Sequence, residues 1–244
     1  YNSFDVIISS CPIAKNLRNL GVKTPLILWT GHDANQGALD ALNNEDERLL
    51  WNKVINVSKW QSSRFLNKFK FSPEILEIIP NGIAPSFEIK RSNRDYFFLS
   101  QRPPILTYTS TPFRGLEIFL RAFPIISRHI PGISAKVFSS MKTYSVEEEN
   151  DQFTELYNLA RQTKNIKYYG SVGQKELSEE IKTSDIFAYP CIFEETSCIS
   201  LMEAMASECV IISSDLGALK ETSGGFGFYL PFDTTHPPKE LSQC

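Results

Sequence analysis

Hydrophobic and polar positions along the chain alternate between short apolar runs and longer segments with helical periodicity. The helical segments fall at residues 116–127, 146–163, 174–183 and 199–207. The apolar runs are rich in β-branched and aromatic residues, which predicts buried strands. These runs are residues 5–9, 25–30, 53–57, 75–79, 105–109, 133–138, 166–169, 185–189 and 210–213. Strands that alternate with helices predict an α/β fold with parallel sheets, in which ligands bind beyond the carboxyl ends of the strands.

A polar stretch near the middle of the chain interrupts this alternation. Residues 84–95 combine a proline with a charge-rich run, and further prolines follow at Pro103 and Pro104, as is typical of a linker. We therefore predict a first Rossmann-like domain at residues 1–84, a linker at 85–104 and a second Rossmann-like domain at 105–244. Because the chain begins at Tyr1 rather than at a methionine, we interpret the first domain as incomplete.

Composition and charge narrow the functional class. The chain is 42% hydrophobic and 22% charged, as in ordinary globular proteins, and its net charge of -3 argues against nucleic-acid binding. Neither an apolar run of the ~18 residues that a membrane span needs nor a signal peptide is visible. The five cysteines and three histidines lack metal-ligand spacing. These features predict a cytoplasmic protein with reduced thiols and no metal site.

The most informative segment contains two glutamates, Glu195 and Glu203, on either side of a predicted helix start. The hydroxyls of Thr196 and Ser197 suit an N-cap, and the N–H groups of a first helical turn attract anions. Carboxylates flanking an anion site suit a ligand with hydroxyls at both ends and phosphates between them, such as a nucleotide-sugar. From the spacing alone, the two glutamates can also serve only to stabilise the positive end of the helix dipole.

The stretch from Glu195 to Ala206 resembles the E-x7-E signature of retaining GT-B glycosyltransferases of the family 4, or group 1, type, although the glycines usual after the first glutamate are absent. This resemblance implies a GT-B-like fold and an enzyme of hexosyltransferase type (EC 2.4). The enzyme would move a sugar from a UDP- or GDP-sugar to a glycan, lipid or other acceptor, as in polysaccharide biosynthesis. The sequence contains no D-x-D triplet, so we expect neither a metal-dependent mechanism nor a cofactor.

The resemblance also implies roles for the residues of this segment. Glu203 would hold ribose hydroxyls, and Glu195 would contact hydroxyls of the transferred sugar as a catalytic residue. The donor diphosphate would be held by the backbone of the residues that open the helix, Thr196, Ser197, Cys198 and Ile199.

A second motif, Thr111-Pro112-Phe113-Arg114-Gly115, has the pattern of a helix start, with Thr111 as N-cap and proline in the first turn. A cation at that end of a helix is unfavourable by a few tenths of a kcal/mol, a cost that a bound anion would offset. The simpler interpretation of Arg114 is a solvated surface side chain. The motif resembles the family's K-G element, with Arg114 in place of the lysine that contacts the diphosphate, whereas Thr109 stands where the family usually has an arginine.

Two further residues are assigned through the resemblance. Val172 lies in a loop that in the family borders the nucleobase, which its backbone would contact. His32 follows a predicted strand at the position where related enzymes carry a histidine facing the transferred sugar, which implies a polarising or hydrogen-bonding role, with Asp33 a weaker candidate. Without the resemblance, Val172 would be interpreted as part of a strand–helix turn and His32 as a structural histidine.

Two rival functions are open. The first is that of a related enzyme, a sugar-nucleotide epimerase or a phosphorylase, which the E-x7-E segment and the missing cofactor-lysine signature disfavour. A non-catalytic nucleotide- or sugar-binding module derived from a truncated GT-B enzyme is the main alternative. A lipid-linked acceptor would bring the protein to the inner face of a membrane, but no basic amphipathic stretch supports such attachment.

Overall fold

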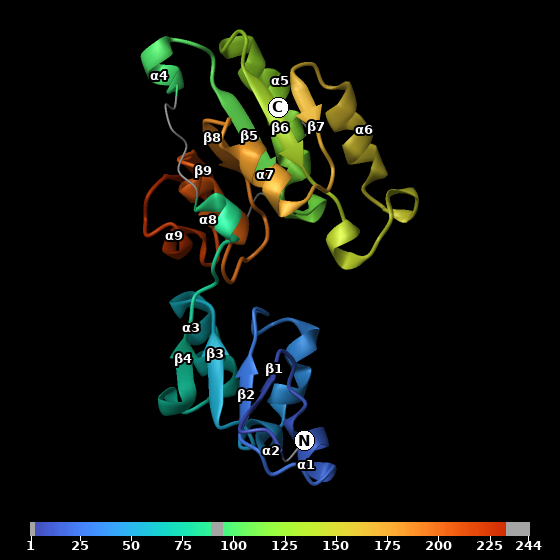
Figure 1. The fold of residues 1–244 in the computed structure, drawn as a ribbon, viewed down its shortest axis with the longest axis vertical. Coiled ribbons are helices and arrows are strands. Elements are labelled where there is room, and N and C mark those ends of the chain that lie inside the picture. The colour runs from blue at the N-terminus through green and yellow to red at the C-terminus, as the bar shows by residue number, and fades with distance from the viewer. Residues whose placement is uncertain (1–2, 89–94, 233–244) are drawn as a thin grey trace. The chain divides into compact units, whose positions relative to one another are not determined.

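The computed structural model describes residues 3–88 and 95–232 of the chain. Its contacts divide the chain into two compact units. The first comprises Tyr1–Asn81 and Glu194–Cys198, and the second comprises Gly82–Phe193 and Ile199–Cys244. Each unit is built on a parallel sheet (Figure 1). This confirms the predicted α/β fold.

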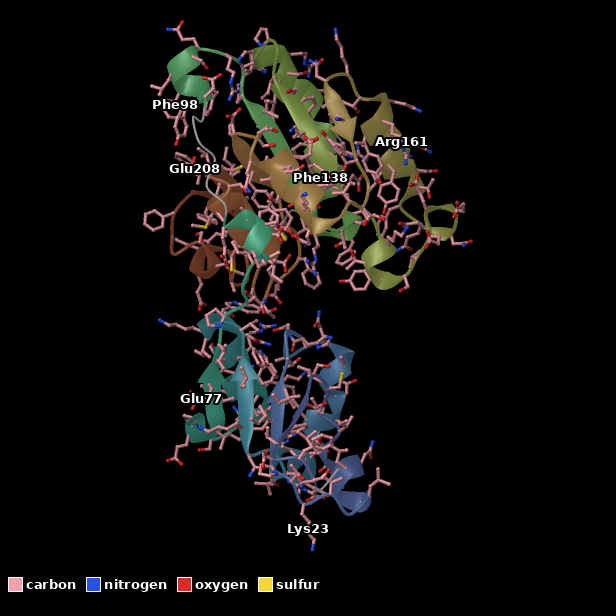
Figure 2. All side chains as sticks on the ribbon, in the orientation of Figure 1. Lys23, Glu77, Phe98, Phe138, Arg161 and Glu208 are labelled. Atoms are coloured by element: carbon pink, nitrogen blue, oxygen red, sulfur yellow. The ribbon has the colours of Figure 1, made fainter. Side chains whose placement is uncertain are left out.

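The sheet of the first unit has four parallel strands in sequential order. They are β1 (Ile7–Ser9), β2 (Leu26–Trp29), β3 (Lys53–Asn56) and β4 (Leu76–Ile78). The helices of this unit are α1 (Ala14–Asn19), α2 (Glu45–Arg48) and α3 (Lys59–Phe69). Leu26, Leu28 and Val54 are fully buried and lie on one face of the sheet, because residues two apart in a strand share a face and Leu28 pairs with Val54. Lys23 and Glu77 lie on the surface of this unit (Figure 2).

Two polar contacts set helix starts in the first unit. Helix α3 was not predicted from the sequence, yet its N-cap Ser58 accepts a hydrogen bond from the Gln61 N–H at 3.0 Å. Helix α1 starts against the carboxylate of Glu47, which accepts the backbone N–H groups of Ala14 and Lys15 at 2.7 Å each. Glu47 is 3% exposed, and each of its two carboxylate oxygens accepts one of these N–H groups.

The second unit contains six parallel strands in the order β10-β9-β8-β5-β6-β7. They are β5 (Ile105–Thr109), β6 (Ser134–Phe138), β7 (Ile166–Tyr168), β8 (Ile186–Tyr189), β9 (Val210–Asp215) and β10 (Phe228–Pro231). The chain runs outwards from β5 to β7 and then crosses back to β8 on the other side of β5. This is the doubly wound Rossmann order, and its switch point lies between β5 and β8.

The helices of the second unit depart from the sequence prediction at several points. They are α4 (Phe97–Ser100), α5 (Leu116–His129), α6 (Thr154–Gln162), α7 (Gln174–Ile181), α8 (Ile199–Ala206) and α9 (Leu219–Thr222), with α6 alongside β7 (Figure 1). The helix predicted at 146–163 begins only at Thr154, because Asp151 accepts the Phe153 N–H at 2.9 Å and ends the preceding turn. Thr111 makes no side-chain cap; a 3₁₀ turn covers Pro112–Arg114, and α5 starts after Gly115.

A partly buried ion pair lies at the start of β5. Both terminal nitrogens of Arg102 bind the Asp185 carboxylate, at 2.7 and 2.8 Å, and the Ile105 N–H donates to the same carboxylate at 2.8 Å. Phe138, at the end of β6, lies inside this unit, whereas Arg161 lies nearer its surface (Figure 2). Over the described residues, no helix is long and apolar enough to cross a bilayer.

Candidate functional site

A pocket of about 270 Å³ opens in the second unit beside the carboxyl ends of β5 and β6 and the loop after β7. The first turns of α7 and α8 complete it. Its position at the switch point is where doubly wound sheets bind ligands. Much of its lining consists of small hydroxyl side chains: Thr109, Ser110, Thr111, Ser139, Ser140, Thr143, Ser171 and Ser200. These groups suit a polar ligand with many hydrogen-bonding atoms.

The carboxylate in this pocket belongs to Glu203 on α8, whose other buried residues, Leu201 and Ala204, are apolar. Glu203 is 3% exposed. Burial raises its pKa from the usual 4.5 to about 7, against a smaller lowering effect of a hydrogen bond from Gln174. A buried carboxyl with a strongly raised pKa in a pocket is typical of a ligand-binding position.

The cation in the pocket is Arg114, at the end of the 3₁₀ turn. Its guanidinium carbon lies 4.9 Å from the Phe193 ring centroid and 5.4 Å from that of Phe113, which holds the group by cation–π attraction. The next residue, Gly115, has φ +128°, and a Cβ atom there would lie 2.1 Å from the carbonyl oxygen of Pro190. Only glycine fits this approach, which fixes the position of Arg114 against the loop after β8.

The same pocket is lined by Val172, in the loop after β7, and by Ile199, the first residue of α8. The structure thus brings together four predicted donor-binding residues, Arg114, Val172, Ile199 and Glu203. The other three, Thr196, Ser197 and Cys198, do not line it. Because α8 begins at Ile199, the residue at its N-cap position is Cys198 rather than Thr196 or Ser197.

The predicted catalytic residues His32 and Glu195 both belong to the first unit. Glu195 is 4% exposed. On one side of it, Glu194 pairs with Arg64 at 3.2 Å. On the other side, the Thr196 hydroxyl donates to the Gly31 carbonyl, next to His32, at 2.6 Å. His32 follows β2, and its Nδ1 lies 3.0 Å from the Thr30 hydroxyl.

Asp33, the weaker catalytic candidate, is engaged in a bidentate ion pair. Its two carboxylate oxygens accept Nε and Nη2 of Arg64, each at 3.1 Å. Burial acts to raise the pKa of Asp33, but the hydrogen bonds from Arg64 and from the Asn35 backbone outweigh it and hold the pKa below its usual value. Arg64 also lies 5.0 Å from the Trp60 ring. Asp33 therefore has a structural partner that its sequence position did not reveal.

Comparison with known proteins assigns the chain to a family. Residues 103–240, more than half of the chain, match the family described as Glycosyl transferases group 1. The chain belongs to this family. The predicted resemblance to GT-B glycosyltransferases of the group 1 type is therefore confirmed.

Solved structures show the same GT-B fold for this glycosyltransferase. Anabaena HepE in complex with UDP-glucose superposes with a TM-score of 0.67 at 16% identity, over 100% of this chain and 69% of that one. The pneumococcal O-GlcNAc transferase GtfA, with UDP and GlcNAc, gives 0.68 at 14%, over 98% and 48%. Thermosynechococcus elongatus sucrose-phosphate synthase gives 0.67 at 15%, over 99% and 64%. The chain thus spans between about half and about two thirds of these proteins. No curated protein matches it.

Several polar residues near the glycosyltransferase sites escaped the sequence analysis. Gln174 binds Glu203, and Gln61 and Thr30 hold the loop of His32. Gln61 sits in the Val57–Gln61 stretch, which follows a strand and contains an N-cap serine. The N-cap serine predicts the start of a helix. It does not predict that Gln61 binds the His32 carbonyl, because His32 lies far away in the sequence.

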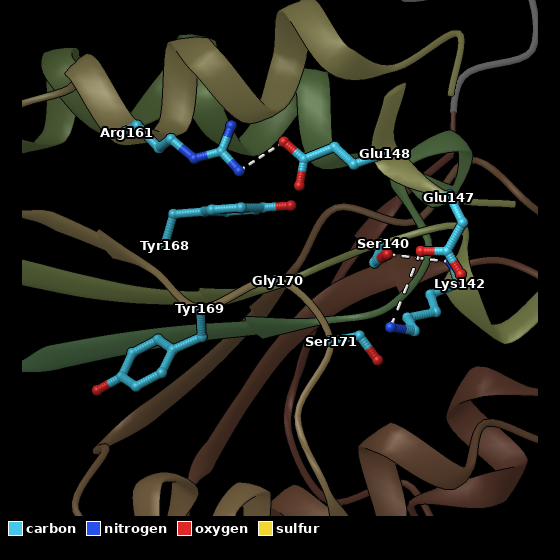
Figure 3. A pocket seen from close by; sticks show the side chains of 9 residues that line it. All are labelled: Ser140, Lys142, Glu147, Glu148, Arg161, Tyr168, Tyr169, Gly170 and Ser171. Atoms are coloured by element: carbon cyan, nitrogen blue, oxygen red, sulfur yellow. Dashed lines mark hydrogen bonds and ion pairs between the residues drawn. The ribbon is translucent and has the colours of Figure 1, made fainter. Parts of the chain in front are cut away.

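A second pocket, of about 330 Å³, adjoins the first and shares Ser140, Gly170 and Ser171 with it (Figure 3). Its charged side chains are paired: Arg161 with Glu148 at 2.6 Å, and Lys142 with Glu147 at 3.9 Å. Arg161 also lies over the ring of Tyr168, 4.6 Å from its centroid. These mutual pairs account for the charges of the second pocket, so the first pocket is the stronger candidate for a ligand site. Among the described residues, no group of three or more potential metal ligands occurs.

Proposed function

We propose that this glycosyltransferase takes its sugar from a UDP- or GDP-linked donor bound in the first pocket. The observation that carries the proposal is the meeting of a buried carboxyl, Glu203, and a fixed cation, Arg114, at the switch point of the second sheet. Two of the similar structures contain UDP-glucose or UDP with GlcNAc, which supports a nucleotide-sugar as the ligand.

Each group in the pocket has a proposed role. Glu203 accepts hydrogen bonds from the ribose hydroxyls, and the backbone of Val172 contacts the nucleobase. Arg114 and the first N–H groups of α8 bind the diphosphate, since a guanidinium and a helix N-terminus both attract anions.

The proposed reaction retains the configuration of the sugar. An acceptor hydroxyl attacks the anomeric carbon on the face from which the diphosphate departs. The bond from that carbon to the phosphate oxygen breaks, and this oxygen takes the proton of the acceptor hydroxyl. Stabilisation of the leaving group by Arg114 lowers the barrier. Glu195 and His32 contact the transferred sugar, and no step requires a metal ion. The acceptor is a glycan or a lipid-linked glycan.

A second candidate function is nucleotide or sugar binding without turnover. Release of nucleotide from a bound donor in the presence of an oligosaccharide acceptor separates the two functions. Turnover supports the enzyme, whereas tight donor binding without turnover supports the binding module.

The donor site is tested by calorimetric titration with UDP, GDP and ADP. We expect one nucleotide to bind the native chain and to bind the Glu203→Ala variant less tightly by ~1–3 kcal/mol, the usual cost of removing one partner of a buried hydrogen bond. Glu155→Ala is the matched control, because Glu155 is an exposed glutamate of α6 in the same unit. Equal binding by the native chain and Glu203→Ala, or no binding at all, would contradict the assignment.

A further inference from the structure

The segment between Thr30 and Gln36 has no regular secondary structure, yet side chains hold it firmly. Gln61, fully buried on α3, is central to this arrangement. Its Oε1 accepts the Val57 N–H at 2.7 Å, and its Nε2 donates to the Thr30 carbonyl at 3.0 Å and to the His32 carbonyl at 2.7 Å. Both amide protons of Gln61 are therefore used to fix the backbone on either side of Gly31.

The hydroxyl of Thr30 contacts both the backbone and the ring of His32. Thr30 is 1% exposed. Its oxygen accepts the backbone N–H of His32 at 3.2 Å and lies 3.0 Å from Nδ1 of the same residue. If Nδ1 carried a proton, the hydroxyl oxygen would accept twice, and its own proton would have no acceptor among the described residues. A buried donor without a partner is unfavourable.

The alternative arrangement gives the Thr30 hydroxyl both a donor and an acceptor. With Nδ1 unprotonated, the Thr30 hydroxyl accepts from the backbone and donates to the ring, and the ring proton sits on Nε2. Within the described part of the chain, Nε2 of His32 has no hydrogen-bond partner. Its N–H is therefore available to a ligand.

We propose that Thr30 and Gln61 are positioning residues that favour the Nε2–H tautomer of His32 over the Nδ1–H tautomer, so that the ring presents an N–H donor to an oxygen of the transferred sugar. The second half of this statement rests on the proposed function. The first half does not, because the tautomer is a property of the ligand-free protein.

Nitrogen NMR of the full chain tests the tautomer directly. Long-range proton–nitrogen correlation spectra of ¹⁵N-labelled protein at pH 8, where a free imidazole is neutral, distinguish protonated from unprotonated ring nitrogens. The chain has three histidines, and the signals of His32 are assigned by their loss in His32→Asn. His129 is an internal reference: its Nδ1 lies 2.9 Å from the Ile125 carbonyl, which can only accept. We expect opposite tautomers, Nε2–H for His32 and Nδ1–H for His129.

Two variants show whether Thr30 causes this state. Thr30→Val removes the hydroxyl at nearly constant shape and is expected to give a mixture of His32 tautomers, while Thr30→Ser keeps the hydroxyl and the single tautomer. Gln61→Met is expected to broaden or multiply the His32 signals. A proton on Nδ1 in the native chain overturns the proposal whether or not any variant folds, and so does an unchanged single tautomer in Thr30→Val.

The contact with the sugar is tested in the same spectra. We expect UDP-glucose to shift the Nε2 signal of His32 and UDP alone to leave it in place. If UDP-glucose binds at the first pocket without moving this signal, the ring does not contact the sugar and that part of the proposal is wrong. If no UDP- or GDP-linked sugar binds, the proposed function fails while the tautomer measurement still decides the role of Thr30.

Discussion

Replacing Glu203 by glutamine should stabilise the protein and weaken donor binding at the same time. The carboxyl group is 3% exposed, and burial raises its pKa from 4.5 to about 7. At about 1.36 kcal/mol for each pH unit between the two pKa values, the folded state loses about 3 kcal/mol when Glu203 ionises. Glutamine keeps the shape of the side chain and an oxygen for the hydrogen bond from Gln174, but carries no charge.

The sign follows from proton linkage. Between pH 4.5 and about 7 the folded protein holds a proton on Glu203 that the unfolded chain has released, so the free energy of unfolding falls as the pH rises through this range. We expect the native chain and Glu203→Gln to differ little in stability below pH 4.5. Above pH 7 the variant should be more stable by about 3 kcal/mol.

Urea denaturation at several pH values measures this difference. Far-UV circular dichroism follows both units, whereas all three tryptophans, Trp29, Trp51 and Trp60, lie in the first unit. Their fluorescence is therefore a control that should not depend on the substitution if the units unfold separately. Glu155→Gln, on the exposed surface of α6, is the matched variant. A stability difference for Glu203→Gln that does not change with pH, or one that favours the native chain at pH 8, would refute the reasoning.

Two further substitutions test how the sites are held. Gly115→Ala should destabilise the second unit by at least ~1–3 kcal/mol, because it combines a strained φ with a Cβ atom 2.1 Å from the Pro190 carbonyl oxygen. Thermal unfolding compares this variant with Gly173→Ala, where no atom lies within 4 Å of the added Cβ. Equal melting temperatures of the two variants would contradict the reasoning. Arg64→Met should cost about 3 kcal/mol at pH 7, because it leaves the buried Asp33 carboxylate without its cation. This loss of stability should shrink as the pH falls below 3.8, the usual pKa of an aspartate, because the Asp33 carboxyl then becomes protonated. Urea denaturation followed by tryptophan fluorescence measures the loss, and a loss that does not change with pH would contradict the role of the ion pair.

The strands of both sheets were predictable because their signal is local. Buried parallel strands are short, apolar and rich in β-branched residues, and the structure has strands at all nine predicted runs. The tenth strand, β10, was missed. It lies at the edge of the sheet, with Phe228 68% exposed and Leu230 67% exposed, and only pairing with β9 defines it. Helix α3 was missed as well, although Ser58 provides a local N-cap.

The first pocket shows how far the sequence could be followed. Arg114, Val172 and Glu203 each stand after a predicted strand, and parallel strands place their carboxyl ends along one edge of the sheet. Their meeting was therefore predictable from the order of elements. The fixed position of Arg114 was not, because it depends on the approach of Gly115 to Pro190 from a distant loop.

The sequence by itself determined the α/β class, the parallel strands and the family, because hydrophobic periodicity and a contiguous motif are read over a few neighbouring residues. Only the tertiary structure decided which carboxyl groups are buried and which side chains hold His32. The raised pKa of Glu203 depends on its burial, and the contacts of His32 depend on Thr30 and on the backbone that Gln61 holds. Such properties depend on desolvation and on hydrogen-bond partners far apart in the chain, and folding alone brings these together.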